Sequence, residues 1–418
     1  MERTTLRIEA DPCRVFSALC DERGAIFLET QKPSFSERYS FIAWNPERIF
    51  EGDVTDLNKR DFFDFIFSYS RNYFVAGYIG YEACQWIEDL PVPGEKDTGN
   101  PHIFLAAYPH FLIFDHLRKT WVLFHRGVPP ALPGRPGKRR CTGASKMTGF
   151  NQTKAIYLEN VGQVLDHIRA GDVYQINYTQ RAHFTRPGDL FDLYLRLKKT
   201  QPVCYAAFLN LGRGAVISGS PELFLRLRHN KILSKPMKGT RKRSPEPTID
   251  RRLRCELKES PKDQAENVMI VDLMRNDLGR FCDYGSVKVP RRSVVEAYHT
   301  VYQMVSYVSG VPKTGSRLQD MIRATFPPGS ITGAPKKRAM QIIYELEPHQ
   351  RGVYCGAMGY FFKDEMVLNV AIRTLEFWDG NGVLGIGGGI VADSDPELEY
   401  EESIIKAKAS MMALGIAL

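Results

Sequence analysis

Hydrophobic and polar positions alternate over short distances in residues 1–126, where runs of β-branched and aromatic residues are bounded by turn residues. Such runs are typical of β-strands, because branched and aromatic side chains pack well on a pleated surface. We expect strands at residues 25–29, 39–43, 74–81, 103–107 and 121–125. The first 126 residues are therefore predicted to form a strand-rich N-terminal region.

A stretch rich in glycine and proline follows this region. Residues 127–149 contain four prolines, five glycines and a basic run, and they show little periodicity. Glycine and proline interrupt regular structure, so this stretch is predicted to be a linker or a long surface loop.

Apolar residues recur at helical spacing after the linker. Residues 151–170 show this spacing and end at Gly171, and further helices are expected at residues 263–278 and 398–414. Elsewhere strand often follows strand, and no internal repeat is present. This order favours an α/β protein of the α+β type, with two large, mostly antiparallel sheets facing each other and helices outside. Residues 150–418 would form its second region.

The composition is that of an ordinary globular protein. Of the 418 residues, 43% are hydrophobic and 25% are charged, which excludes disordered and fibrous proteins. The length suits one very large domain or two lobes. The apolar stretches are too short to cross a membrane, and the N-terminus is too charged for a signal peptide. Eight scattered cysteines without a zinc-site spacing fit a reducing compartment, so we expect a cytoplasmic protein.

The net charge of +8 allows two interpretations, a nucleic-acid partner or a basic surface that attracts an anionic substrate. The basic clusters are short and scattered, and none alternates with aromatic residues as a base-stacking surface would. We therefore expect no nucleic-acid partner.

Two glycine-rich stretches were compared with nucleotide-binding motifs. Residues 329–336 lack the Lys-Ser or Lys-Thr pair of a P-loop, and residues 385–390 lack the last glycine of a dinucleotide-binding loop. Gly387, Gly388 and Gly389 either form a tight strand bend or allow backbone N–H groups to approach an anionic ligand.

Acidic pairs and one lysine are the other candidates for chemistry. Asp263 and Glu266 share a helix face, as do Glu399 and Glu402, so the two pairs either bind one Mg²⁺ ion or are solvated. Lys238 lies in a glycine-flanked turn before three further basic residues. It is either an exposed turn lysine or a nucleophile whose pKa is lowered by burial and by neighbouring cations.

Several ordered segments resemble the chorismate-utilising enzymes, specifically component I of aminodeoxychorismate synthase and of anthranilate synthase. The resemblance is carried by residues 171–181, 218–224, 236–240, 265–280, 326–336, 387–396 and 401–407. It implies the fold of that family and makes residues 150–418 the chorismate-binding catalytic region.

Within that family, the resemblance points to one activity. Aminodeoxychorismate synthases have a lysine at the position of Lys238, where anthranilate synthases have an alanine. Gln175 stands where isochorismate and salicylate synthases have a lysine base. The resemblance therefore implies amination of chorismate to 4-amino-4-deoxychorismate, the precursor of p-aminobenzoate and folate. Anthranilate synthase component I is the alternative, and a non-catalytic anion-binding subunit is a more distant one.

The resemblance also implies a role for each site residue. Lys238 would attack the substrate ring and Glu222 would act as general acid and base. The Mg²⁺ cofactor would be held by Glu266 and Glu402, with Asp263 and Glu399 close by. Substrate contacts would come from Gln175, Gly239, Thr240, Tyr354, Arg373, Gly387, Gly388, Gly389 and Lys406.

The expected reactants are chorismate and ammonia. No cysteine has the Gly-x-Cys-x-Gly setting of a glutaminase nucleophile, so a separate glutamine amidotransferase subunit, component II, is the expected partner. Two positions depart from the family pattern. Gln303 replaces a usual histidine, with His299 nearby but out of register, and residues 28–30 match the family's feedback-ligand motif only loosely.

Overall fold

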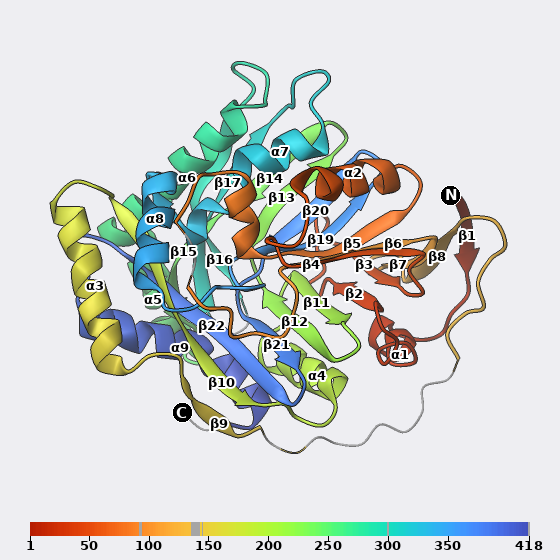
Figure 1. Ribbon diagram of the computed structural model, residues 1–418, viewed down its shortest axis with the longest axis horizontal. Coiled ribbons are helices and arrows are strands. Elements are labelled where there is room, and N and C mark those ends of the chain that lie inside the picture. Colours follow the sequence, from red (N-terminus) through yellow and green to blue (C-terminus); the bar gives the residue numbers. More distant parts are fainter. Residues whose placement is uncertain (92–93, 135–142, 144, 299–300, 417–418) are drawn as a thin grey trace.

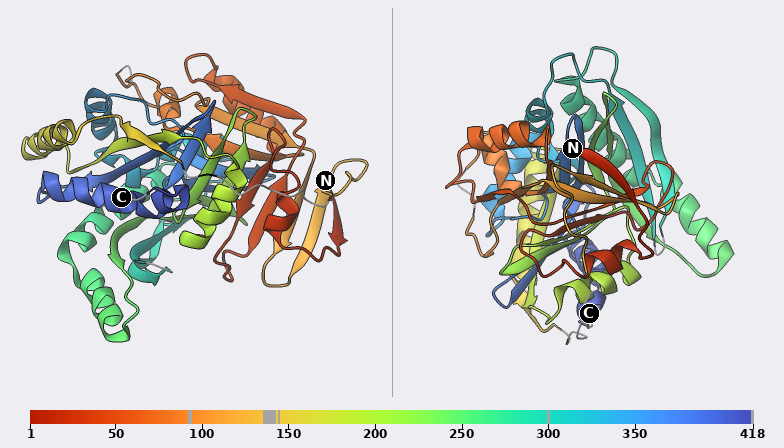
Figure 2. Two further views of the ribbon diagram at one scale, coloured as in Figure 1. Left: turned by 90° about the horizontal axis from the view of Figure 1, so that it is seen from below. Right: turned by 90° about the vertical axis from the view of Figure 1, so that its right-hand side faces the viewer.

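Two large antiparallel sheets form the centre of the protein, as the computed structural model shows for residues 1–418 except 92–93, 135–142, 144, 299–300 and 417–418. Helices lie against the sheets in all three views (Figures 1 and 2). The larger sheet has twelve strands. In spatial order these are β1 (Glu2–Leu6), β8 (Thr120–His125), β7 (His110–Asp115), β3 (Tyr39–Ala43), β2 (Ile26–Glu29), β11 (Tyr205–Asn210), β12 (Gly214–Ser220), β21 (Thr374–Trp378), β22 (Asn381–Ile390), β10 (Gln175–Thr185) and β18 (Gly333–Ala334), with β9 (Met147–Phe150) also paired to β10.

The second sheet has ten strands, and the N-terminal region contributes to it as well. Its order is β15 (Met237–Lys242), β17 (Val301–Gly310), β14 (Lys231–Lys235), β13 (Leu223–Arg228), β20 (Glu365–Val370), β19 (Ala357–Phe362), β5 (Phe74–Ile79), β6 (Ile103–Tyr108) and β4 (Arg48–Gly52), with β16 (Lys288–Ala297) paired to β17. Strands from residues 1–126 and from residues 150–418 are thus hydrogen-bonded into both sheets.

The inner faces of the two sheets pack against each other. On β5, Phe74, Ala76 and Tyr78 point into the core between the sheets, whereas Val75 and Ile79 join the core on the outer face. A strand covered on both faces is apolar at nearly every position, which explains why residues 74–79 read as a continuous hydrophobic run. Phe74 stacks on Phe111 of the other sheet, with ring centroids 4.3 Å apart.

The helices cover the outer faces of the sheets, and several begin at side-chain caps. Ser260 and Asp395 cap the two helices that flank the candidate site, α6 and α9, by accepting hydrogen bonds from backbone N–H groups of the first turn. The helices are α1 (Pro12–Phe16), α2 (Lys59–Ser70), α3 (Lys154–Arg169), α4 (Leu190–Thr200), α5 (Pro247–Glu259), α6 (Pro261–Gly279), α7 (Leu318–Thr325), α8 (Lys336–Leu346) and α9 (Pro396–Leu414), with short 3₁₀ turns η1 (Tyr81–Trp86) and η2 (Gly329–Ile331).

The predicted fold class is confirmed, and three local predictions differ from the structure. The expected strand at 74–81 ends at Ile79, because Tyr81 begins η1. The linker expected at 127–149 reaches only to Lys146, because Met147 begins a strand that pairs with β10; much of that stretch lies outside the described residues. The tight bend considered for Gly387–Gly389 is absent, since these glycines lie inside β22 opposite Thr179, Tyr178 and Asn177.

Candidate active site

A lysine placed beside a strand bulge is at the centre of the candidate site. Lys238 lies on β15, whose register with β17 shifts between Lys238 and Thr240. Gly239 occupies the irregular position with a φ of +71°, and a β-carbon there would lie 2.6 Å from Oδ1 of Asp263 on α6. Both observations require glycine at this position. The bulge therefore brings the lysine strand into direct contact with helix α6.

The lysine points towards an open strand edge. Its Nζ atom donates a hydrogen bond to the carbonyl oxygen of Ser330 in η2 over 3.2 Å. A β-carbon at position 389 would lie 3.2 Å from Nζ of Lys238 and 2.4 Å from Nε2 of Gln175. Lys238, Gln175 and Gly389 therefore meet at one point. Gln175 is buried, and neither of its amide atoms has a hydrogen-bond partner among the residues that the structure describes.

Strand β22 has a free edge at this point. It pairs with β21 only as far as Leu375 opposite Leu384, so within the described part of the chain residues 385–390 pair with β10 alone. Lys406 of α9 donates a hydrogen bond over 3.3 Å to the carbonyl oxygen of Gly387 on this stretch. An open edge without side chains offers backbone N–H groups to an anion, which supports the second of the two interpretations of these glycines.

The pKa values of Lys238 and Glu222 are shifted in the directions that a nucleophilic amine and a general acid require. Burial lowers the pKa of Lys238, against the opposing charge of Glu266, and the positive charge of Lys406 adds to the lowering. Glu222, only 4% exposed, has its pKa raised by burial to about 7. The charges of Lys238 and Arg373 both act on Glu222, which places these groups near one another.

Arg373 and Tyr354 are the predicted binding residues near the ends of β21 and β19. Arg373 has a φ of +52°, and burial lowers its pKa to about 10. The ring of Tyr354 is buried against Gly385, where a β-carbon would lie 2.2 Å from ring atoms. A partly buried guanidinium group and a buried phenol are suited to binding an anionic, ring-shaped ligand.

The four predicted metal-binding carboxylates lie on the two helices that border this edge. Asp263 and Glu266 belong to α6, and Glu399 and Glu402 belong to α9. Burial raises the pKa of Glu266, and the negative charges of Asp263 and Glu399 raise it further. Carboxylates of both helices therefore face each other.

Cationic side chains already neutralise three of these carboxylates. Asp263 pairs with Arg241 over 2.8 Å, Glu402 with Lys406 over 2.8 Å, and Glu399 with Lys262 over 3.6 Å. Among the described residues, Glu266 has no ion-pair partner.

No group of three or more His, Cys, Asp or Glu side chains in the described part of the chain is arranged to hold a metal ion. Mg²⁺ usually takes only one or two protein carboxylates, with water and substrate oxygens completing its shell. Glu266 and Glu402 fit that smaller donor set.

Not every residue named from the sequence joins this group. Thr240 is exposed and pairs through its backbone with Gln303, and His299 lies outside the described residues. No role for Ser330 could be predicted from its side chain, because its contact with Lys238 uses a backbone carbonyl oxygen. It also missed Lys262, whose exposed position in the first turn of α6 carries no distinguishing motif.

Residues 22–412 match the protein family described as chorismate binding enzyme. The chain belongs to this family. It is a chorismate-utilising enzyme, as the sequence motifs predicted.

Individual chorismate-binding enzymes are similar over most of the chain. Aminodeoxychorismate synthase component 1 of Escherichia coli (strain K12) is 40% identical over 344 residues, covering 81% of this chain and 76% of that protein. Anthranilate synthase component 1 of Streptomyces coelicolor is 37% identical over 369 residues, covering 81% and 72%. The crystal structure of anthranilate synthase component I from Streptococcus pneumoniae matches 90% of this chain and 93% of that one, with a TM-score of 0.80 and 28% identity.

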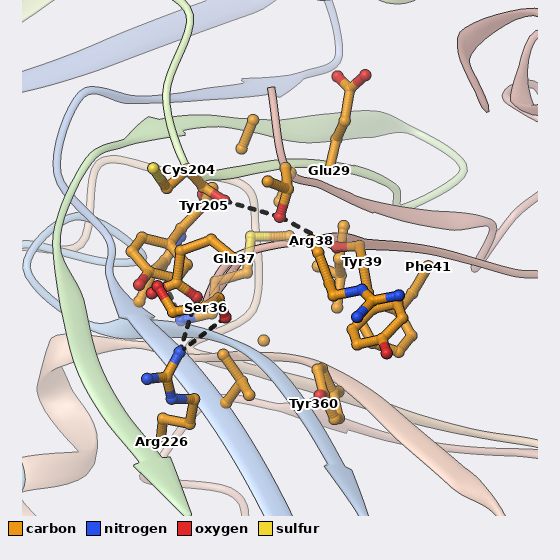
Figure 3. A pocket seen from close by; sticks show the side chains of 18 of the residues that line it. Glu29, Ser36, Glu37, Arg38, Tyr39, Phe41, Cys204, Tyr205, Arg226 and Tyr360 are labelled. Carbon is orange, nitrogen blue, oxygen red and sulfur yellow. Dashed lines mark hydrogen bonds and ion pairs between the residues drawn. The ribbon is translucent and has the colours of Figure 1, made fainter. Parts of the chain in front are cut away.

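The chorismate-binding enzyme also has a pocket apart from the candidate site. It lies between the two sheets and is bordered by Leu28, Glu29 and Thr30 together with residues from β11, β13, β19 and β20. Figure 3 shows Arg226 bonded to Glu37 and to the backbone of Ser36 at its wall. None of the predicted site residues lines it. Among the described helices, none combines the length and the apolar character that a membrane span requires.

Proposed function

We propose that this enzyme aminates chorismate to 4-amino-4-deoxychorismate and uses Lys238 as a covalent nucleophile. The proposal rests chiefly on the position of Lys238, whose amine is partly buried beside the open edge of β22 and has a lowered pKa. A lysine needs a lowered pKa to attack carbon near neutral pH. The similarity to aminodeoxychorismate synthase component 1 supports the same assignment.

Chorismate carries two carboxylates, and the site offers a separate set of donors for each. In this proposal, Arg373 and Tyr354 would bind one carboxylate, and the glycines of β22 together with Lys406 would bind the other. In this proposal, these groups orient the ring so that its C2 atom faces Nζ of Lys238. The free amide of Gln175 would bind a polar group of the substrate or of the incoming ammonia.

The reaction would proceed in two displacements. In the first, Nζ of Lys238 bonds to C2, both conjugated ring double bonds shift by one position, and the C4–O bond breaks as Glu222 delivers a proton and water leaves. A pKa of about 7 lets Glu222 carry that proton at neutral pH. In the second, ammonia bonds to C4, both double bonds shift back, and the C2–N bond to the lysine breaks. Glu222 then takes a proton from the new ammonium group, and the enolpyruvyl side chain is retained.

Glu266 and Glu402 are the residues that would hold Mg²⁺. When bound, the ion would supply positive charge to offset a substrate carboxylate and would make the ring a better electron acceptor. Asp263 and Glu399, each paired with a cationic side chain, would lie close to the ion without binding it directly.

Anthranilate synthase component I is the second candidate, because a relative with that name is 37% identical to this chain. The two activities differ in whether the product keeps its enolpyruvyl group. Lys238 lies beside Gly389, where we expect the substrate to bind, and a lysine nucleophile there favours amination at C4. We therefore prefer aminodeoxychorismate synthesis to anthranilate synthesis.

The name component 1, shared by the relatives, implies a second component. We propose that it is a glutamine amidotransferase that supplies ammonia. A cytoplasmic location goes with the proposal, since the seven described cysteines are all free thiols.

The test is a product analysis. Purified protein is incubated with chorismate, an ammonium salt and Mg²⁺, and the product is identified by mass. A product that retains the enolpyruvyl group supports the proposal, whereas anthranilate with released pyruvate would establish the second candidate instead.

A further inference from the structure

A buried arginine behind the candidate site links its two walls. Arg351 is 2% exposed, and its guanidinium group donates four hydrogen bonds. Two go to the carboxylate of Glu347, with Nε to Oε2 at 2.8 Å and Nη2 to Oε1 at 2.7 Å. The other two go to backbone carbonyl oxygens, from Nη1 to Ile331 at 2.8 Å and from Nη2 to Asn177 at 2.6 Å.

These two carbonyl groups belong to η2 and β10, the two segments that meet at the amine of Lys238. Ile331 follows Ser330, whose carbonyl oxygen accepts the hydrogen bond from Nζ of Lys238. Asn177 lies opposite Gly389 in the sheet, two residues after Gln175. One guanidinium group therefore connects η2, which orients the amine of Lys238, to β10, which carries Gln175.

The partner carboxylate strengthens the same connection. Oε1 of Glu347 also accepts hydrogen bonds from the backbone N–H and the hydroxyl of Thr179, both at 2.9 Å. Arg351 and Glu347 are thus hydrogen-bonded to β10 at two nearby positions, Asn177 and Thr179. A paired, fully hydrogen-bonded charge in a buried site is rigid, because losing either partner leaves the other unpaired in a medium of low polarity.

The backbone of Arg351 is fixed from the opposite side. Glu82, buried in η1, accepts hydrogen bonds from the backbone N–H groups of Arg351 and Gly352 at 2.7 and 3.0 Å. The guanidinium carbon lies 4.6 Å from the ring centroid of Tyr81. Arg351 is therefore immobile at both ends, and its four donated bonds leave it no role in binding substrate.

We propose that the Arg351–Glu347 pair is a positioning device that sets the distance between Lys238 and the strand edge where the substrate ring is held. This inference rests on the proposed function in one respect, the use of Lys238 as the nucleophile. Neither residue touches the reacting atoms. They act through Ile331 and Asn177, so their loss would misplace the lysine without removing any substrate contact.

Arg351→Lys is the most informative variant. Lysine keeps the charge, but a single ammonium group cannot replace the planar fork that reaches Glu347, Ile331 and Asn177 together. Misplacement of a reacting group by about 1 Å lowers turnover roughly 100-fold. We expect kcat to fall by about two orders of magnitude, while KM for chorismate changes less than about threefold.

Hydrogen–deuterium exchange supplies a readout that needs no turnover. Faster exchange is expected in peptides covering residues 175–179 and 330–334, because the N–H of Asn177 donates to the carbonyl oxygen of Thr332 across this junction. Arg181→Lys is the matched control, since Arg181 is a buried arginine of the same strand that pairs with Asp97. It should leave kcat and the exchange of both peptides unchanged.

Each outcome has a defined meaning. A folded Arg351→Lys protein with wild-type kcat and wild-type exchange would overturn the inference, as would a rise in KM at unchanged kcat. If Arg351→Lys does not fold, Glu347→Gln takes its place with the same expectations, at about tenfold in kcat. If the wild-type protein forms no adduct on Lys238, the proposed function fails, yet local loosening of the two peptides would still support a positioning role.

Discussion

Nζ of Lys238 donates a hydrogen bond to the carbonyl oxygen of Ser330 at 3.2 Å. A neutral carbonyl oxygen orients the amine without adding the full negative charge that would hold it as an ammonium ion. The carboxylate of Glu266 does act on the lysine, but burial outweighs it and the pKa of Lys238 is lowered. The contact therefore directs the amine while leaving it able to lose its proton.

Replacing Lys238 with alanine should stop the covalent step. With chorismate but no ammonia, intact-mass spectra of the wild-type protein should show an adduct of chorismate minus water, and the Lys238→Ala protein should show none. Product formation should fall by about three orders of magnitude or more, with chorismate affinity nearly unchanged. No adduct on the wild-type protein and near-normal turnover of the variant would show that Lys238 only binds substrate.

Glu222 should give the enzyme an alkaline limit. Because its pKa is raised to about 7, only about a tenth of the enzyme would hold the catalytic proton at pH 8. We expect kcat/KM to fall with an apparent pKa near 7 and Glu222→Gln to lose both that limb and most of the activity. A wild-type profile that is flat from pH 6 to pH 9 would contradict the role of Glu222 as an acid.

The raised pKa of Glu222 should also make the stability of the fold depend on pH. A carboxyl group whose pKa is higher in the folded than in the unfolded state stabilises the fold at low pH, and that contribution is lost as pH rises through the folded value. For Glu222 the loss amounts to roughly 3 kcal/mol by pH 8. The melting temperature of Glu222→Gln relative to the wild type should therefore increase between pH 5 and pH 8. An equal difference at both pH values would argue against the raised pKa.

Gly389→Ala should impair catalysis without unfolding the protein. The new methyl group would stand 2.4 Å from Nε2 of Gln175, so the glutamine or the strand edge must move. We expect kcat/KM to drop about 100-fold. Gly162→Ala is the control, because nothing lies within 4 Å of a β-carbon there; it should keep full activity and gain about 0.5–1 kcal/mol of helix stability. Equal kinetics for both variants would place the substrate elsewhere.

Glu266→Gln and Glu402→Gln should weaken Mg²⁺ and chorismate together, since the ion and the substrate carboxylate would share one coordination shell. The Mg²⁺ concentration giving half-maximal activity should rise at least about tenfold. Glu397 lies on α9 with Glu402 but forms an exposed ion pair with Lys154 of α3, so Glu397→Gln should leave that Mg²⁺ concentration unchanged. Wild-type Mg²⁺ dependence in both test variants would remove them from the metal site.

The pure chain should use ammonium ions but not glutamine. A glutaminase requires a thiolate on a tight elbow, and no cysteine of the chain has the Gly-x-Cys-x-Gly setting of such a nucleophile. Product formation from glutamine by protein free of any amidotransferase would contradict this expectation.

The sequence could predict the fold class and the helices that flank the site, because their patterns are local. The apolar spacing within α9 and the runs that became β3 and β8 are each determined by neighbouring residues. Sheet order could not be predicted in this way. Nothing in the local pattern of β5 indicates that it lies between β6 and β19.

The residues of the candidate site also fall into two groups, those that sequence motifs predicted and those that they did not. Lys238, Glu222 and the carboxylates of α6 and α9 stood out through their motifs, and the structure brings them around one strand edge. Arg351 and Glu347 did not stand out, because an arginine four residues after a glutamate is usually an exposed helix pair. Only burial, together with backbone partners from β10 and η2, distinguishes this pair.

The pairing of β5 with β19 has a consequence for how the chain is made. Gly77 of β5 lies opposite Gly359, which leaves the ribosome 282 residues later. At a synthesis rate of about 5–20 residues per second, the apolar strand β5 is made roughly 15–60 s before β19. During that time its edge can pair with any other extended chain. A newly made molecule is therefore expected to depend on chaperones that shield this edge until β19 has been made.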